Sequence, residues 1–235
     1  QWGQYVSTTP QGDVKVKVDF QAQGSKMKLS IRNTIYDAKG KVVAKSQGNE
    51  VQQLKVRNPQ LWDIAKGYLY TVKSELVVNG KVVDTATTTT GFRDVKFDAQ
   101  KGFFLNGRNI KINGVCEHHD FGCLGAAVNE DAMHRKLTIL RDMGVNAIRS
   151  SHNPPAPELL NMCDSMGLLV MDESFDMWRR KKSNGDYARF FDEWHKRDLS
   201  DLIKRDRNHP SIIMWSIGNE VLEQWSDAAA DTLSL

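Results

Sequence analysis

The sequence predicts a mixed fold, in which a small antiparallel β-sandwich is followed by a parallel sheet covered by helices. Two observations predict it. Apolar residues alternate with polar ones from residue 13 to about residue 97, and period two is typical of strands. After residue 97, stretches with helical spacing alternate with short apolar runs, which is typical of strands buried under helices on both faces.

The first region has the pattern of a sandwich of the immunoglobulin type. Its predicted strands are "DVKVKVDF", "KMKLSIRNTIYD", "KVVAKSQG", "YLYTVKSELVV" and "KVVDTATTTTGF". Turn residues separate them, among them "DAKGK" and Asn79-Gly80, the dipeptide that best supports a two-residue hairpin. About six short strands in about ninety residues suit this fold. We therefore expect an immunoglobulin-like β-sandwich over residues 1–95.

The second region, residues 96–235, begins with a hairpin in "FFLNGRNIKIN" that turns at Asn106-Gly107. A helix is predicted after the cap residue Asn129 and ends at Gly144. The apolar side of this helix consists of Leu137, Leu140 and Met143. Two further helices are predicted in "APELLNMCDSMG" and "RFFDEWHKRDLSDLIKRDRN". The predicted strands are "NIKINGV", "VNAIRSSHNP", "LLVMDE" and "SIIMWSIGNE".

Polar residues follow each of these four strands. They are Glu117, His118, His119 and Asp120; Arg149, Ser150, Ser151, His152 and Asn153; Asp172 and Glu173; and Asn219 and Glu220. In a (β/α)8 barrel the functional side chains converge at the carboxyl ends of the strands. With Trp178 and Trp215 nearby, such a pocket suits a sugar, which presents both hydroxyls and C–H faces. Several other polar ligands would suit it equally. For any single residue, a salt bridge or a helix cap is the ordinary alternative.

The segment "NGVCEHHDFGC" raises the question of a metal site. Cys116, His119 and Cys123 have chemistry suited to zinc, but a structural zinc site normally takes its fourth ligand from a second short-spaced pair, which this chain lacks. We therefore expect no metal, and expect the cysteines to pack as small apolar residues around the pocket.

The composition is that of an ordinary globular protein, with 40% hydrophobic and 26% charged residues. A net charge of +3 is too small to indicate a nucleic-acid surface, and the basic run from Arg179 to Lys182 is interpreted as a solvated loop.

No apolar run is long enough for a membrane span. The chain starts with neither methionine nor a signal-peptide pattern. Compartment is left open, with a periplasmic or extracellular location favoured over a cytoplasmic one.

The stretch "RDRNHPSIIMWSIGNE" closely resembles the acid/base motif of glycoside hydrolase family 2, which groups β-galactosidases, β-glucuronidases and β-mannosidases. The likeness extends through "NPQLWD", "GFRDV", "FFLNGRNIKINGV", "MGVNAIRSSHNPP" and "CDSMGLLVMDE", so it covers almost the whole chain. The resemblance implies an immunoglobulin-like β-sandwich followed by an incomplete (β/α)8 TIM barrel. It also implies an enzyme that hydrolyses glycosidic bonds without a cofactor.

The resemblance assigns a role to each candidate residue. Glu220 is the general acid/base, Asn219 binds the sugar 2-hydroxyl, His118 and His152 contact the sugar, and Arg149 orients the nucleophile. Asp172, Glu173 and Trp178 are the remaining substrate-binding residues, as walls of the pocket. A glycosidase acid has to hold a proton near neutral pH, and burial of Glu220 against Trp215 would help it to do so.

The resemblance also implies retention of anomeric configuration, which needs a second carboxylate about 5 Å from the acid. In the family the nucleophilic glutamate lies on a later strand, and only fifteen residues follow Glu220. We therefore expect the sequence to be a central segment of a longer enzyme and to be inactive alone.

Two departures bear on specificity. Galactosidases of the enterobacterial type hold magnesium with a Glu and a His after the third barrel strand, where this chain has Asp176 and Trp178. We therefore predict no metal site there.

"VCEHHDFGCLGAA" and "FDMW" resemble a branch of β-galactosidases from polysaccharide-degrading bacteria, which favours the release of terminal β-linked galactose. The alternatives are a β-glucuronidase, a β-mannosidase, or a non-catalytic carbohydrate-binding or structural module. The expected partners are a carbohydrate substrate and a second copy of the chain, and neither nucleic acid nor a membrane.

Overall fold

The computed structural model of the chain describes residues 2–21 and 28–225. It contains two compact units. The first comprises residues 1–112 with 163–168 and 207–211, and the second comprises residues 113–162, 169–206 and 212–235. The predicted domain boundary between residues 95 and 96 stays a prediction. Lys26 and Met27, where a strand was predicted to begin, and residues 226–235 lie outside the described residues.

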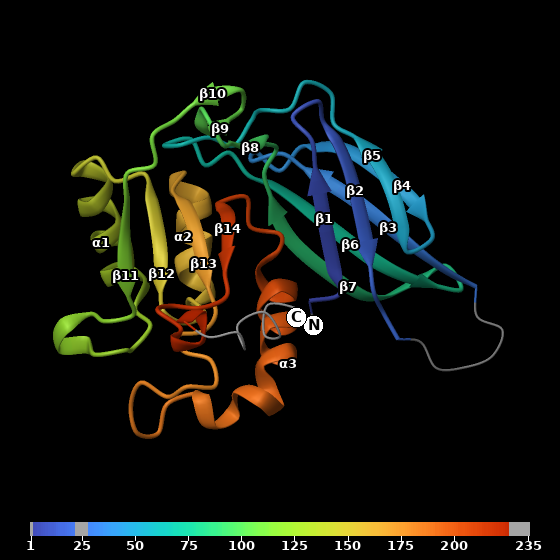
Figure 1. Cartoon of the computed structure of the whole chain (residues 1–235). Helices are drawn as coiled ribbons and strands as arrows, with labels where there is room; N and C mark the ends of the chain where they lie inside the picture. The colour runs from blue at the N-terminus through green and yellow to red at the C-terminus, as the bar shows by residue number, and fades with distance from the viewer. Residues whose placement is uncertain (1, 22–27, 226–235) are drawn as a thin grey trace. The chain divides into compact units, whose positions relative to one another are not determined.

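The first unit is an antiparallel sandwich of two sheets with strand orders β1-β2-β5 and β4-β3-β6-β7 (Figure 1). Its strands are β1 Gln4–Thr8, β2 Asp13–Val18, β3 Leu29–Tyr36, β4 Val42–Gly48, β5 Val51–Lys55, β6 Tyr70–Val78 and β7 Lys81–Thr90. The predicted period-two strands are thus present. The sequence analysis missed β1 and β5, which are short and pair on either side of β2.

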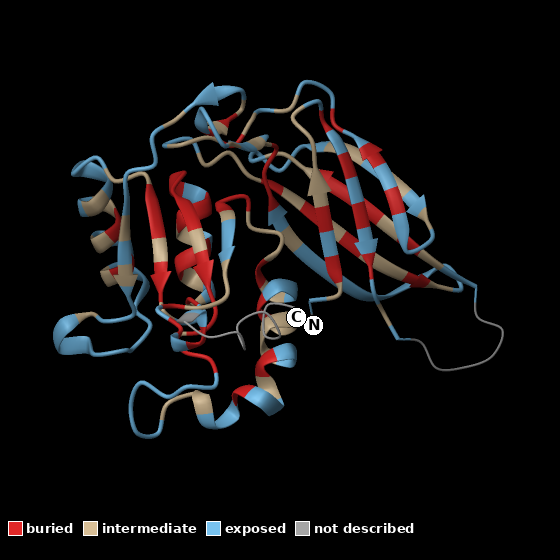
Figure 2. Ribbon diagram, in the orientation of Figure 1, coloured by how far each residue is buried: buried red, intermediate tan, exposed pale blue. Residues whose placement is uncertain are grey.

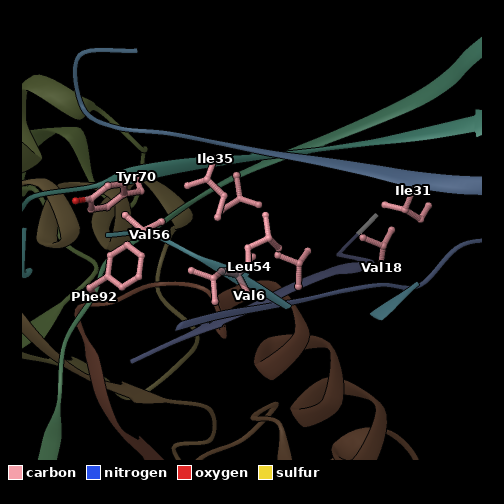
Figure 3. Packing of buried hydrophobic residues seen from close by; sticks show 11 residues of the cluster. Val6, Val18, Ile31, Ile35, Leu54, Val56, Tyr70 and Phe92 are labelled. Carbon is pink, nitrogen blue, oxygen red and sulfur yellow. The ribbon is translucent and has the colours of Figure 1, made fainter. Parts of the chain in front are cut away.

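The core of this sandwich follows from the alternation. Along β2, Val14, Val16 and Val18 are buried while the residues between them are exposed (Figure 2). Side chains from both sheets meet between them (Figure 3). The labelled members are Val6, Val18, Ile31, Ile35, Leu54, Val56, Tyr70 and Phe92. Burial of this apolar surface is the main stabilising contribution to the unit.

Two predicted hairpins have the expected turns. At the β6–β7 turn Asn79 has φ 50° and Gly80 has φ 83°, and at the next hairpin Asn106 has φ 51° and Gly107 has φ 76°. These pairs of positive φ values are those of a type I′ turn, which matches the twist of the flanking strands. The second hairpin belongs to a small sheet of β8 Val95–Asp98, β9 Gly102–Leu105 and β10 Arg108–Asn109.

The second unit contains a four-stranded parallel sheet in the order β11-β12-β13-β14 (Figure 1). Its strands are β11 Gly114–His118, β12 Ala147–Ser151, β13 Leu169–Glu173 and β14 Ile212–Ser216. The helices between them are α1 Glu130–Asp142, α2 Pro157–Met166 and α3 Ala188–Asp206, with short 3-10 helices η1 Gly122–Leu124 and η2 Leu222–Trp225. Alternation of strand and helix in sequential order is the arrangement that the apolar runs predicted.

Helix α1 begins as predicted, because the Asn129 side chain accepts a hydrogen bond from the backbone N–H of Ala132. Two details of the prediction are wrong. Met143 is 74% exposed and does not belong to the apolar face, which is formed by Met133 and Leu137. The first parallel strand is β11 and not "NIKINGV", since residues 110–113 have no strand geometry and the strand continues to His118.

Across residues 2–21 and 28–225, every helix is too short or too polar to span a membrane.

Candidate active site

Arg149, near the end of β12, forms the centre of a hydrogen-bonded network at the carboxyl ends of the strands. Its Nε donates to Glu173 Oε2 at 3.0 Å, and its Nη2 donates to Glu173 Oε1 at 2.9 Å and to Asn219 Oδ1 at 2.9 Å. Burial disfavours the charge of Arg149, but the bonds to Glu173 outweigh it and raise the pKa of the guanidinium. The guanidinium therefore links β12, β13 and the segment that follows β14.

Glu173 is fully buried, and both of its oxygens are occupied. Besides the two Arg149 bonds, Oε1 lies 2.8 Å from His152 Nδ1 and Oε2 accepts a bond from Ser216 Oγ at 2.6 Å. His152 Nδ1 also lies 3.3 Å from Arg149 Nη2, but the shorter contact to Glu173 favours the tautomer in which Nδ1 donates to the carboxyl oxygen. Nε2 of His152 is then the ring nitrogen that faces other partners.

His118 ends β11 and is exposed, and its ring centre lies 5.0 Å from that of His152 at an interplanar angle of 83°. The loop after it is held by Lys136 of α1. The Lys136 ammonium donates to Glu117 Oε1 and, at 2.8 Å, to the backbone oxygen of Asp120. A hollow of about 440 Å³ lies beside this loop, lined in part by His118, His119 and Asn153. The lining of this hollow also has apolar side chains, which are those of Phe121, Met133, Pro154, Pro155 and Leu159. Arg149, His152, Asn219 and Glu220 are not among its lining residues.

Asn219 has its amide fixed at both ends. Oδ1 accepts from Arg149, and Nδ2 donates to Asp176 Oδ1 at 3.0 Å. The backbone N–H of Asn219 also donates to the backbone oxygen of Phe175 at 3.0 Å. An amide nitrogen has two protons, so one N–H of Nδ2 remains for a ligand.

Glu220 follows Asn219 with φ 44°, in the left-handed region that non-glycine residues rarely adopt. Its side chain is exposed, and its carboxylate makes no hydrogen bond or ion pair within the described part of the chain. The prediction that Glu220 is buried against Trp215 is therefore wrong: Glu220 faces solvent, and Trp215 is itself 37% exposed. The exposed carboxyl is free to meet a ligand.

Trp178 contacts the segment on both sides of Glu220 through Ile217 and Val221. It is buried with Phe175, Phe191 and Val221, and its Nε1 donates to the backbone oxygen of Ile217 at 2.7 Å. A Cβ atom at Gly218 would lie 2.9 Å from Trp178 Nε1 and 2.8 Å from Val221 Cγ1. Only glycine fits at position 218, because no Cβ contact is that short.

Asp172 has a different environment from its neighbour Glu173. It is fully buried, and no N–H or hydroxyl group of the described residues donates to its oxygens, which lie within hydrogen-bond reach of the Asp206 carboxylate. Burial, followed by the negative charge of Asp206, raises the pKa of Asp172 to about 8. Asp206 itself is paired through both oxygens with Arg205 at 2.7 Å. Asp172 is therefore a neutral acid at pH 7.

The structure thus brings together Arg149, His152, Glu173, Asn219 and Glu220, with His118 beside them. Asp172, Glu173 and Trp178 have exposed fractions of 0%, 0% and 4%, and their assignment as substrate-binding residues stays a prediction. Sequence reasoning missed Ser216 and Lys182. Ser216 is an ordinary strand residue in the sequence, and Lys182 was assigned to a solvated loop.

Across residues 2–21 and 28–225, no three His, Cys, Asp or Glu side chains gather as metal ligands would. Cys116 and Cys123 are exposed, which contradicts the prediction that they pack as apolar residues. At Asp176, where the resemblance raised magnesium, the carboxylate instead binds the Lys182 ammonium at 2.8 Å, so the residues present do not fit a divalent cation.

Comparison with known proteins identifies the family of the chain. The family model for the TIM barrel domain of glycosyl hydrolases family 2 matches residues 95–233, and a second model described as glycosyl hydrolases family 2 matches residues 4–93. A β-galactosidase of Bacteroides ovatus is 54% identical over 100% of this chain and 29% of its own length. A putative β-glucuronidase of Formosa agariphila is 44% identical over 87% of this chain and 20% of its own length.

Among solved structures, a β-glycosidase from Bacteroides vulgatus aligns with a TM-score of 0.91 and 37% identity. The alignment covers 99% of this chain and 31% of that protein. The chain thus spans less than a third of each of these three relatives. With both family models matched in order along it, the chain belongs to glycosyl hydrolases family 2, as an immunoglobulin-like domain followed by part of a TIM barrel.

Proposed function

We propose that the protein containing this chain is a retaining glycoside hydrolase that releases terminal β-linked galactose from oligosaccharides or polysaccharides. The observation that carries the proposal is the Arg149 network, which fixes Asn219 and leaves the adjacent Glu220 carboxyl exposed to a ligand. In this reading Glu220 protonates the leaving glycosidic oxygen and then takes a proton from the attacking water.

The remaining roles follow from which groups are still available for a substrate. The second N–H of Asn219 Nδ2 binds a sugar hydroxyl, while Arg149 and Asp176 occupy the rest of the amide. Exposed His118 and the Nε2 atom of His152 are the imidazole groups that contact the sugar. Glu173 orients Arg149 and His152 and does not contact the substrate.

The nucleophile of a retaining mechanism is neither Asp172 nor Glu173. Asp172 is protonated at neutral pH because its pKa is about 8, and it is buried. Four donor atoms surround the two oxygens of Glu173, and no surface of it is accessible. We propose that a carboxylate outside residues 1–235 supplies this role, so that residues 1–235 alone do not turn over substrate.

Galactose is favoured over glucuronic acid because the relative with 54% identity is a β-galactosidase, whereas the putative β-glucuronidase is 44% identical. The sugar preference depends on a few pocket contacts. A β-glucuronidase therefore remains the second candidate. A β-mannosidase and a non-catalytic carbohydrate-binding module are the weaker alternatives, since a binding module has no need of the exposed Glu220.

The test measures release of nitrophenol from aryl β-galactoside, β-glucuronide and β-mannoside by the full-length protein. We expect hydrolysis of the β-galactoside, and a loss of at least about 100-fold in turnover for Glu220→Gln, the lower range for general acid–base catalysis. The anomeric form of the first product, followed by NMR, should show retention. Unchanged turnover in Glu220→Gln, or an inverted product, would contradict the proposal.

The activity of the chain alone needs a separate test. Residues 1–235 are expected to be inert on all three substrates while circular dichroism shows folded secondary structure. If this folded chain hydrolyses a substrate and its Glu220→Gln variant does not, the argument about the nucleophile is refuted, and the role of Glu173 has to be revised.

A further inference from the structure

The loop between β13 and α3 contains a lysine whose ammonium is directed at the candidate acid/base segment. Lys182 Nζ donates to Asp176 Oδ1 at 2.8 Å and to the backbone oxygen of Asn219 at 2.7 Å. The side chains are partly shielded, with exposed fractions of 23% for Lys182 and 31% for Asp176. Surface ion pairs usually contribute little, but this ammonium also bonds to the peptide group between Asn219 and Glu220.

Asp176 contacts the same segment through a side chain. Its Oδ1 accepts from Asn219 Nδ2 at 3.0 Å as well as from Lys182. Burial alone would raise the pKa of Asp176, but hydrogen bonds from Lys182 and Asn219 outweigh it and lower the pKa below its usual value. Asp176 is therefore ionised at neutral pH. Together Lys182 and Asp176 hold Asn219 by its backbone and its side chain.

The loop itself is anchored so that Lys182 is held in place. The Asp186 carboxylate accepts from the backbone N–H of Lys182 at 2.8 Å and of Ser183 at 2.9 Å. It also accepts from the backbone N–H of Ala188, the first residue of α3, at 3.1 Å. The loop segment that contains Lys182 is thus bonded through Asp186 to the start of α3.

We infer that Lys182 and Asp176 are positioning residues for the acid/base Glu220, an inference that rests on the proposed function. Glu220 is in the left-handed region, which a non-glycine residue leaves readily unless its surroundings hold it. The Lys182 bond to the carbonyl of Asn219 fixes the peptide plane that precedes Glu220, and so fixes the direction in which its carboxyl points. Neither residue touches the substrate.

The test compares substrates that differ only in how much they need the acid. A dinitrophenolate leaves without protonation, whereas an alkyl alcohol needs a proton. In the full-length protein, with the sugar that the first assay selects, we expect Lys182→Met to lower kcat/KM for the alkyl glycoside by roughly tenfold or more, a fraction of the roughly 100-fold due to a general acid. We expect little change for the dinitrophenyl glycoside. Lys182→Arg should restore part of the activity. Asp176→Asn also releases the Asn219 amide that binds the sugar, so it should lower kcat/KM for both glycosides, and more for the alkyl glycoside.

The control is Lys181→Met, which removes the same charge from the same exposed loop and should leave both substrates unaffected. Glu220→Gln separates the two proposals: if it retains turnover, the proposed function fails whatever Lys182 does. If Glu220→Gln is inactive on the alkyl glycoside but Lys182→Met and Asp176→Asn stay within twofold of wild type, the inference is overturned. An equal loss on both substrates with a lowered melting temperature would also overturn it, because that indicates a merely structural role.

Discussion

The protonation of Asp172 gives the most direct test of the environment around the site. Asp172 is fully buried, and no N–H or hydroxyl group of the described residues donates to its oxygens, which lie within hydrogen-bond reach of the Asp206 carboxylate. Its pKa of about 8 lies well above the value of 3.8 expected in an unfolded chain. Between these two pH values the folded state holds a proton on Asp172 that the unfolded state has released. Rising pH therefore lowers the free energy of unfolding, which is highest below the unfolded pKa.

The magnitude follows from proton linkage. One proton contributes about 1.36 kcal/mol per pH unit, so from pH 5 to pH 7 this carboxyl should cost roughly 2.7 kcal/mol of unfolding free energy. Asp172→Asn has a similar shape and cannot ionise, so it should not show this part of the pH dependence. We expect the free energy of unfolding of the variant to increase relative to that of wild type as the pH rises from 5 to 7. The difference should not grow further above about pH 8, where Asp172 is ionised in both the folded and the unfolded state.

The measurement is urea unfolding of the full-length protein at pH 5, 6, 7 and 8, followed by circular dichroism. Asp142→Asn, at an exposed position at the end of α1, changes the net charge equally and serves as the control. The assignment of a neutral buried acid is refuted if the free energy of unfolding depends on pH in the same way for wild type and Asp172→Asn. It is also refuted if the variant becomes more stable relative to wild type at low pH instead.

Three other predictions concern the core, the network and a turn. Ile35→Ala, in the sandwich core, should lower the free energy of unfolding by about 2–5 kcal/mol in a urea titration. The control is Val83→Ala, at a position that is 57% exposed, which should change the free energy of unfolding by less than about 0.5 kcal/mol. Arg149→Lys keeps the charge but loses the forked bond to Glu173, and we expect kcat/KM to fall at least about tenfold with a lowered melting temperature; wild-type values for both would contradict the role of the network. Gly80 has φ 83° and open space around it, so a side chain at this position would be strained by the backbone alone. Gly80→Ala should therefore lower the free energy of unfolding by about 1 kcal/mol. An unchanged urea midpoint would show that the turn adapts.

Local features of the fold could be predicted because the residues that determine them are close in sequence. The Asn79-Gly80 and Asn106-Gly107 turns and the Asn129 cap depend on two to four consecutive residues. Strands β1 and β5 were missed because each has only five residues and shows little alternation that a sequence window can detect. Their identity as strands depends on pairing with β2.

The candidate site could be predicted in part. The rule that functional groups follow the strands of a barrel selected Arg149, His152, Asn219 and Glu220. It could not separate Asp172 from Glu173, because both end the same strand. Adjacent strand residues point to opposite faces, so one faces Arg149 and the other faces the Asp206 region. The sequence alone does not say which one.

By itself, then, the sequence determined the order of strands and helices, the family and the candidate acid/base, since these depend on local spacing and on a contiguous motif. Only the tertiary structure decided that Glu173 is enclosed by Arg149, His152 and Ser216, that Asp172 is buried and neutral, and that Lys182 is turned toward Asn219. The physical reason is that burial and hydrogen bonding arise between residues distant in the chain, such as Lys182 and Asn219, and local pattern carries no information about such pairs.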